Sequence, residues 1–258
     1  MARVFCPFFF RMLAAAALCC ALFPAAAGAD DLSGQGRAVF GAAKDSVITV
    51  KAVISMSFGG EEQVNEQEAN ATVINSDGLA VLSLSAVDLT SLFAAMEDLP
   101  EGVSSKLVSL KMVGQDGSEQ EAEVVLRDKD LDLAFIRPTA KPEVPMPNVN
   151  LENLAVPGVM DPVVVVGQMG AVAQRAHIAF IERIEGVVEK PRRFYILGEH
   201  RSEQVMCSPV FTMEGGFAGI GAMRVTRGGK SMQENVMVIV VPAAQIAELV
   251  EQVPARAE

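Results

Sequence analysis

The sequence predicts an all-β protein with two antiparallel β-barrels followed by one α-helix. Short runs rich in β-branched residues recur at even spacing, and turn residues separate them. The proline-rich stretch Pro138 to Pro147 divides these runs into two halves and is typical of a linker. The clearest amphipathic helical pattern lies at the end, over Ala243 to Val253 after Pro242. These three observations together favour two barrels and a closing helix.

Composition and charge exclude several classes of protein. The chain has 258 residues, of which 50% are hydrophobic, so it is not a disordered, collagen-like or coiled-coil protein. Its formal net charge is −11. A nucleic-acid binder needs a clustered basic surface, whereas the longest basic run here is Arg192-Arg193. We therefore expect no nucleic acid among its partners.

The first 29 residues have the pattern of a secretory signal peptide. Arg3 and Arg11 flank an apolar stretch that continues without charge from Leu13 to Ala27. Small residues around Ala29 predict cleavage after it. A retained anchor would need about 20 uninterrupted apolar residues, and Pro24 interrupts this run. The pattern predicts an exported protein, periplasmic or secreted, with no stable membrane anchor after cleavage.

Residues 30–147 are expected to form the N-terminal barrel and the linker. The expected strands are Ser46–Ser57, Ala71–Ile74, Leu79–Leu84, Lys106–Val113, Glu121–Arg127 and Leu131–Arg137. Asp77-Gly78 is a hairpin turn pair. The glycine- and glutamate-rich stretch Phe58–Asn70 is expected to be a loop, and Leu89–Ser104 a helix or helical turn. The acidic residues of that loop face solvent or meet a basic partner.

Residues 148–258 are expected to form the C-terminal barrel and the closing helix. The expected strands are Pro162–Val166, Ala176–Ile184, Arg193–Leu197, Val210–Met213, Ala218–Arg224 and Met237–Val241. Gly167 and Gly170 follow the first of these strands. A dinucleotide site would need a third glycine and a helix at this point, so no nucleotide or other cofactor is predicted.

Cysteine and histidine patterns predict neither a disulfide nor a metal site. After removal of the signal peptide only Cys207 remains, so the fold cannot contain an intrachain disulfide. No Cys/His cluster, zinc-protease helix motif or calcium loop is present.

Four stretches, in order, resemble the HtrA/Deg-type branch of the trypsin-like serine proteases. Residues 75–87 (NSDGLAVLSLSAV) are similar to the strand, Asp-Gly turn and strand that lead to the family's catalytic histidine. Residues 125–136 (VLRDKDLDLAFI) are similar to its catalytic-aspartate segment, residues 163–170 to its V-x-x-I-G-N-P-x-G strand, and residues 238–253 to its closing strand and helix. The resemblance implies two six-stranded barrels with a cleft between them, and it includes no PDZ domain.

The resemblance also implies a degenerate catalytic triad. The family's mechanism needs a hydroxyl nucleophile, an imidazole base and a carboxylate that orients the imidazole. Matching by position places Ser85 where the family has histidine and keeps the carboxylate as Asp132, hydrogen-bonded to backbone or to Ser85. The nucleophile position holds Met206, a thioether with no proton to lose. Gln204 replaces a glycine that helps to shape the oxyanion hole.

A displaced nucleophile is the alternative. Cys207 and Ser208 follow Met206, and His200 lies shortly before it as a possible base. A thiol needs a base or a cationic neighbour to lower its pKa. The other histidine, His177, lies in an expected strand, where a structural role is the usual one.

The favoured hypothesis is a non-catalytic, exported pseudoprotease. It would bind an unidentified protein or peptide through the inter-barrel cleft or a barrel edge. The alternatives are an active peptidase that uses Cys207 or Ser208, and a structural envelope protein whose cleft is closed by Met206.

Overall fold

The computed structural model describes residues 28–58, 61–90, 103–114, 116–198, 202–225 and 235–256. The chain divides into two units, residues 1–34 and 35–258, and helix α2 (Gly28–Ala43) spans the boundary. All other described elements belong to the second unit. Sequence analysis did not predict α2, which contains three glycines after its first residue. Within the second unit, its Val39 and Ala43 are buried.

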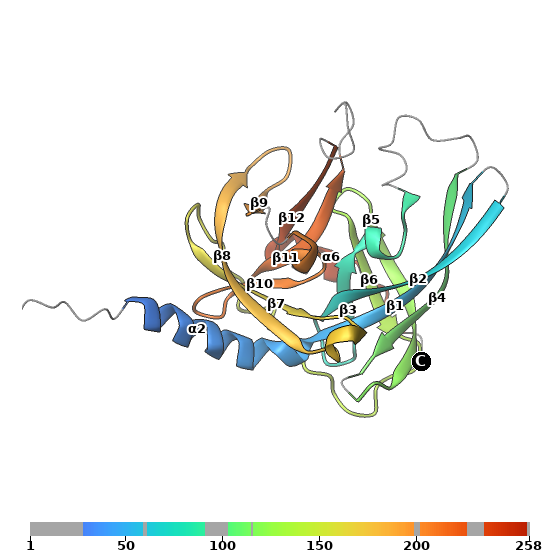
Figure 1. Ribbon diagram of the computed structural model, residues 1–258, viewed down its shortest axis with the longest axis horizontal. Helices are drawn as coiled ribbons and strands as arrows, with labels where there is room; N and C mark the ends of the chain where they lie inside the picture. Colours follow the sequence, from blue (N-terminus) through green and yellow to red (C-terminus); the bar gives the residue numbers. More distant parts are fainter. Residues whose placement is uncertain are drawn as a thin grey trace, which may run out of the picture. The chain divides into compact units, whose positions relative to one another are not determined.

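The prediction of two closed six-stranded antiparallel barrels is confirmed (Figure 1). The N-terminal barrel contains β1 (Val47–Phe58), β2 (Glu61–Val73), β3 (Ala80–Ser83), β4 (Ser104–Val113), β5 (Glu119–Asp128) and β6 (Leu133–Pro138). The C-terminal barrel contains β7 (Pro162–Gln168), β8 (His177–Val188), β9 (Phe194–Leu197), β10 (Pro209–Thr212), β11 (Phe217–Val225) and β12 (Val236–Pro242). Around the first barrel the order is β1-β2-β3-β6-β5-β4, and around the second β7-β8-β9-β12-β11-β10. The two barrels therefore share one topology.

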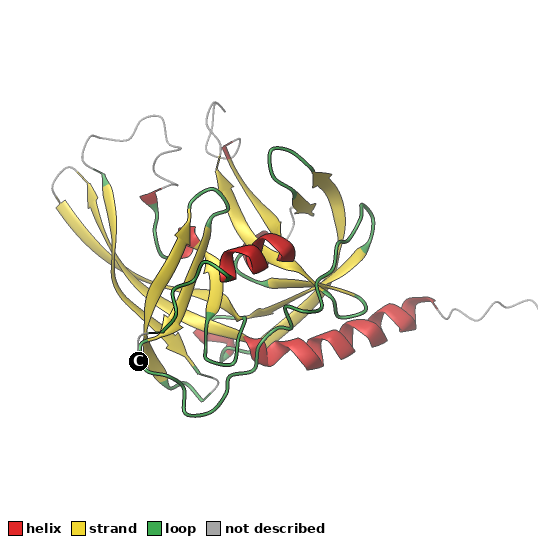
Figure 2. Ribbon diagram, turned by 180° about the vertical axis from the view of Figure 1, so that it is seen from behind, coloured by secondary structure: helices red, strands yellow, loops and turns green. Residues whose placement is uncertain are grey.

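Apolar residues that alternate along the strands fill each barrel. Ile54, Leu82 and Ile136 belong to the core of the N-terminal barrel, and Val163, Ile184 and Val240 to that of the C-terminal barrel. The predicted C-terminal helix is present as α6 (Ala243–Val250), where Ile246 and Leu249 are buried. It packs against β11 and β12, and Figure 2 shows it as the short red helix at the centre of the view. Burial on the inner faces explains why strand periodicity was visible in the sequence.

The expected loop at Phe58–Asn70 is wrong. Phe58 is the last residue of β1, and Glu61–Asn70 lie in β2; the two strands pair in register from Val47↔Thr72 to Phe58↔Glu61. The first six residues of β2 are all exposed, so the segment has no apolar alternation to reveal a strand. Pairing with the apolar β1 imposes the extended conformation. Most of the expected helix Leu89–Ser104 lies outside the described residues, and Ser104 begins β4.

Short 3₁₀ and α-helical turns contain or adjoin Ser85 and Met206, two of the candidate site residues. The turns are η1 (Lys44–Ser46), η2 (Leu84–Ala86), η3 (Ala171–Ala173) and α4 (Ser202–Val205). The turn η2 directly follows β3, and α4 directly precedes the Met206 segment. No helix among the described residues has the length and apolar character needed to cross a membrane.

Candidate functional site at the triad positions

Asp132 and Ser85 are hydrogen-bonded to each other at the boundary of the barrels. Asp132 lies in the turn before β6, with a left-handed backbone (φ 54°), and Ser85 lies in η2. The Ser85 hydroxyl donates to Asp132 Oδ1 over 2.6 Å, and the Ser85 N–H donates to the same oxygen over 2.9 Å. The residue at the family's histidine position thus contacts the carboxylate directly.

The second carboxylate oxygen joins Asp132 to both barrels. Oδ2 accepts the hydroxyl of Ser83 on β3 and, over 2.8 Å, the N–H of Met223 on β11. Asp132 is almost fully buried, and this burial raises the pKa of its carboxyl group above the ordinary value, while the four hydrogen bonds oppose the rise. Donors surround the carboxylate on all sides, so Asp132 is a structural link between the barrels.

Met206, which the sequence resemblance matches to the nucleophile, lies beside β11. It forms an isolated parallel bridge with Gly221, and the following N–H of Cys207 donates to the Gly221 carbonyl over 2.8 Å. This close approach requires a glycine, because a Cβ on Gly221 would lie 1.9 Å from the Val205 carbonyl oxygen. Backbone packing therefore holds the Met206 segment against the second barrel.

Cys207 is buried and points into the N-terminal barrel. It has a left-handed backbone (φ 62°), packs in the core cluster of that barrel, and accepts the Ser83 N–H at Sγ over 3.3 Å. Burial raises the pKa of its thiol to about 12, and the Asp132 charge adds to the rise. At neutral pH the group is a thiol rather than the nucleophilic thiolate.

Ser208 is fully buried, and its hydroxyl donates to the Gln204 carbonyl over 2.8 Å. His177 on β8 has Nε2 3.1 Å from the Val47 carbonyl oxygen, in the structural role expected for it. His200 lies outside the described residues. The burial of Cys207 and Ser208 counts against the displaced-nucleophile alternative.

We expect Cys207 to resist alkylation in the folded protein. Between pH 7 and 9 its thiol is buried and protonated, so iodoacetamide should modify the Cys207 peptide at least about 100-fold more slowly than after denaturation in urea. Mass spectrometry of that peptide separates it from the three cysteines of the first 29 residues. Equal rates in the folded and unfolded protein would contradict the buried position.

A pocket of about 390 Å³ opens where these elements meet. Its lining residues come from both barrels: Thr49, Gln67, Glu68, Ala69, Asn70, Ser85, Ala86, Leu89, Gln168, Met169, Gly170, Met206, Cys207 and Met223. Three residues singled out from the sequence, Ser85, Met206 and Cys207, therefore line one pocket. Met206 lines this pocket, which counts against the alternative in which it closes the cleft. Asp132 lies behind Ser85 and does not line it.

Sequence analysis missed the amide side chains of this pocket. The Thr49 hydroxyl donates to Gln168 Oε1 over 2.8 Å, and Gln67 Nε2 donates to the Ala86 carbonyl over 2.5 Å. The Asn70 amide, in the orientation that satisfies its neighbours, donates to the Gln168 carbonyl over 3.0 Å and accepts the Gln168 N–H over 3.2 Å. The Asn70 bonds join β2 to β7, and the Thr49 bond joins β1 to β7. No motif in the sequence indicated them, because uncharged amides on strands have no diagnostic spacing.

The pocket is mostly uncharged. Glu68, its one ionisable carboxylate, pairs with Arg175 over 2.5 Å. Across the described ranges, no three His, Cys, Asp or Glu side chains gather as a metal site would require. Methionines at positions 169, 206 and 223 supply adaptable apolar surface. Such a pocket can hold an apolar side chain and offers amides to a peptide backbone.

A scan against protein-family models and a search of curated proteins both found no match to this chain. The two closed barrels are compatible with a trypsin-like domain.

Proposed function

We propose that this chain is an exported, HtrA-type trypsin-like pseudoprotease that binds an extended peptide or protein segment in the inter-barrel pocket. One observation carries the proposal: the carboxylate of Asp132, the residue matched to the catalytic aspartate, accepts a hydrogen bond from Ser85, and Met206, the residue matched to the nucleophile, lines the same pocket as Ser85. Acyl transfer needs a base that can take the nucleophile's proton. The hydrogen-bonded Ser85–Asp132 pair presents no such base to the pocket.

The pocket itself supports binding. It has a volume suited to one or two side chains, and both apolar thioethers and amide groups line it. Both barrels contribute to it, and Asp132 and Asn70 link the barrels beside it. Preformed walls lower the entropy cost of binding, because few side chains need to be ordered when the ligand arrives. The signal-like first 29 residues support export.

A binding experiment with a blocked pocket tests the proposal. Fluorescence anisotropy would measure the affinity of the protein for a fluorescein-labelled, permanently unfolded protein. Ala69→Trp places a large side chain in the pocket and should weaken binding at least about tenfold. Val108→Trp is the matched control, because Val108 is exposed on β4 of the same barrel and does not line the pocket. Equal affinity of all three proteins would contradict the proposal.

A further inference from the structure

Among the described residues, one edge of β2 has no strand partner over most of its length. On one side, β2 pairs with β1 from Glu61 to Thr72. On the other side, among the described strands, it pairs with β3 only through Thr72 and Val73. The backbone from Glu61 to Ala71 therefore presents an unpaired edge. Free N–H and C=O groups along such an edge are a template for another extended chain.

This open edge leads into the pocket. Residues 67–70 of β2 are both part of the edge and part of the pocket wall. The Met206 and Met223 side chains line the same pocket. A strand added to β2 would place every second side chain on one face. An apolar side chain at the right position would then enter the methionine-lined pocket.

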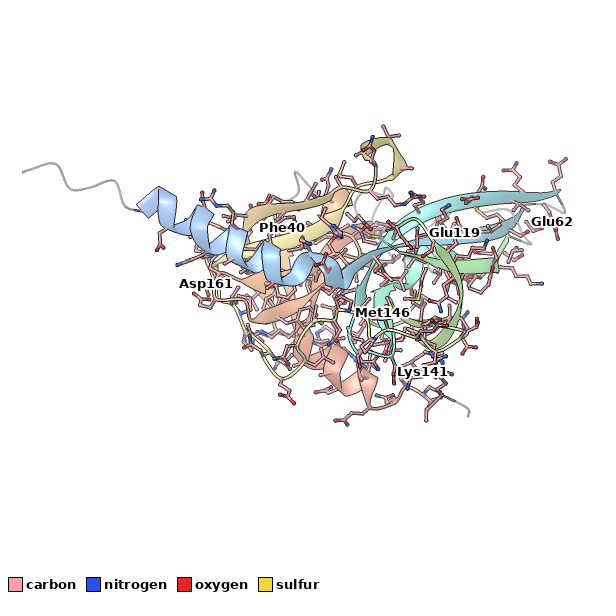
Figure 3. The ribbon with its side chains drawn as sticks, turned by 90° about the horizontal axis from the view of Figure 1, so that it is seen from below. Phe40, Glu62, Glu119, Lys141, Met146 and Asp161 are labelled. Atoms are coloured by element: carbon pink, nitrogen blue, oxygen red, sulfur yellow. The ribbon has the colours of Figure 1, made fainter. Side chains whose placement is uncertain are left out.

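The negative charge of β2 favours an added strand that carries positive charge. The segment Glu61–Val73 contains four glutamates and no lysine or arginine. Glu68 is paired with Arg175, whereas Glu61, Glu62 and Glu66 have no ion-pair partner within the described ranges. Figure 3 shows Glu62 at the far end of the β1–β2 ribbon, away from the rest of the barrel. Exposed charges of one sign attract a ligand of the opposite sign and repel one of the same sign.

We propose that the partner is an extended, lysine- or arginine-rich segment of another protein that adds to β2 as a further strand. Its backbone would pair with the open edge, an apolar side chain would occupy the pocket, and its basic side chains would lie near Glu62 and Glu66, which share one face of β2, and at the strand's end near Glu61. The inference rests on the proposed function and adds to it the chemistry and the backbone register of the ligand.

Three fluorescein-labelled octapeptides test the charge preference. They share the same valine and alanine residues at every second position and carry Lys, Gln or Glu at the others. At about 0.1 M salt, where the Debye length is about 10 Å, the Lys peptide should bind at least about tenfold more tightly than the Gln peptide, and the Glu peptide more weakly than either. The variant Glu61→Gln/Glu62→Gln/Glu66→Gln should remove most of the Lys preference and leave the Gln peptide's affinity within about twofold.

A matched variant controls for net charge. Glu143→Gln/Glu152→Gln/Glu251→Gln removes the same number of charges from exposed positions outside β2 and the pocket. It should change the affinity for the Lys peptide less than about twofold, because charges separated by more than a Debye length are screened. An equal loss in both triple variants would overturn the assignment to β2.

Backbone methylation tests strand addition. A strand at a sheet edge uses the N–H groups of every second residue, so N-methylation of one alternate set should abolish binding of the Lys peptide and methylation of the other should be tolerated. Equal effects of both sets would overturn strand addition.

If Lys and Gln peptides bind alike and Ala69→Trp weakens both, the charge inference fails and the proposed function stands. If Ala69→Trp changes no affinity, the proposed function fails as well.

Discussion

Asp132→Ala should lower the free energy of unfolding by about 3–4 kcal/mol, because it leaves several buried hydrogen-bond donors without an acceptor. The Ser85 and Met223 N–H groups would lose their acceptor, and the hydroxyls of Ser83 and Ser85 would lose theirs. Alanine is also less tolerant than aspartate of the left-handed backbone at this position. Urea denaturation measures the change.

Two variants test whether the loss of unfolding free energy comes from the missing Asp132 hydrogen bonds rather than from removal of any carboxylate in this turn. Asp130→Ala removes a carboxylate that is 78% exposed two residues earlier, and it should change the free energy of unfolding by less than about 0.5 kcal/mol. Asp132→Asn keeps the size and one acceptor oxygen, so its loss should be smaller than that of Asp132→Ala. An Asp132→Ala protein as stable as Asp130→Ala would contradict the role of Asp132 as a link between barrels.

The stability deficit of Asp132→Asn should depend on pH. Burial raises the carboxyl pKa in the folded protein. The folded state therefore favours the protonated acid, and the wild type loses stability as pH rises from about 3.9, the unfolded value, through the folded pKa. The neutral asparagine does not titrate, so the deficit of the variant should be larger at pH 4 than at pH 7. A deficit that grows towards neutral pH would mean that the hydrogen bonds outweigh burial.

Gly221→Ala should have a comparable or larger effect, with a loss of about 3 kcal/mol or more. The new Cβ would lie 1.9 Å from the oxygen and 2.6 Å from the carbon of the Val205 carbonyl group. These are backbone atoms, so either β11 or the Met206 segment must move. Because Met206 lines the pocket, affinity for an unfolded protein should fall together with stability.

Gly41→Ala is the matched control for the glycine substitution. Gly41 lies in α2, and a Cβ there would meet no atom within 4 Å. Alanine is the better helix former by about 1 kcal/mol, so the control should be neutral or stabilising. Denaturation midpoints and anisotropy titrations of both variants would check this. A Gly221→Ala protein with wild-type stability and affinity would contradict the close packing described for the Met206 segment.

The sequence predicted most of the barrel strands because burial leaves a visible alternation of apolar residues. Val163–Val166 and Leu133–Ile136 are fully buried, and their apolar runs were identified as strands. The expected strand Ala71–Ile74 covers only the end of β2. The rest of β2 was missed because its exposed first half is held by pairing with β1, a long-range effect that local patterns do not encode. Helix α2 was missed because its glycines weaken the helical signal.

The site could be predicted in part. The contact between Ser85 and Asp132 follows from two polar residues at matched positions of the two segments. The hydrogen bond from the Met223 N–H to the carboxylate could not be foreseen, because every residue except proline has a backbone N–H and the residue type does not show which one forms the bond. Gln67, Asn70 and Gln168 are likewise ordinary polar residues until the barrels bring β2 and β7 together.

Whether the chain lacks proteolytic activity is tested most directly by an assay for hydrolysis of a fluorescein-labelled unfolded protein by the purified protein. Cys207→Ala and Ser208→Ala would be assayed beside it, together with a mock purification. We expect no cleavage above the mock purification by any of the three folded proteins, because the Cys207 thiol and the Ser208 hydroxyl are buried and Met206, which the sequence resemblance matches to the nucleophile, has no proton to lose. Cleavage by the wild type that disappears in one of the two variants would identify a working nucleophile and contradict the account.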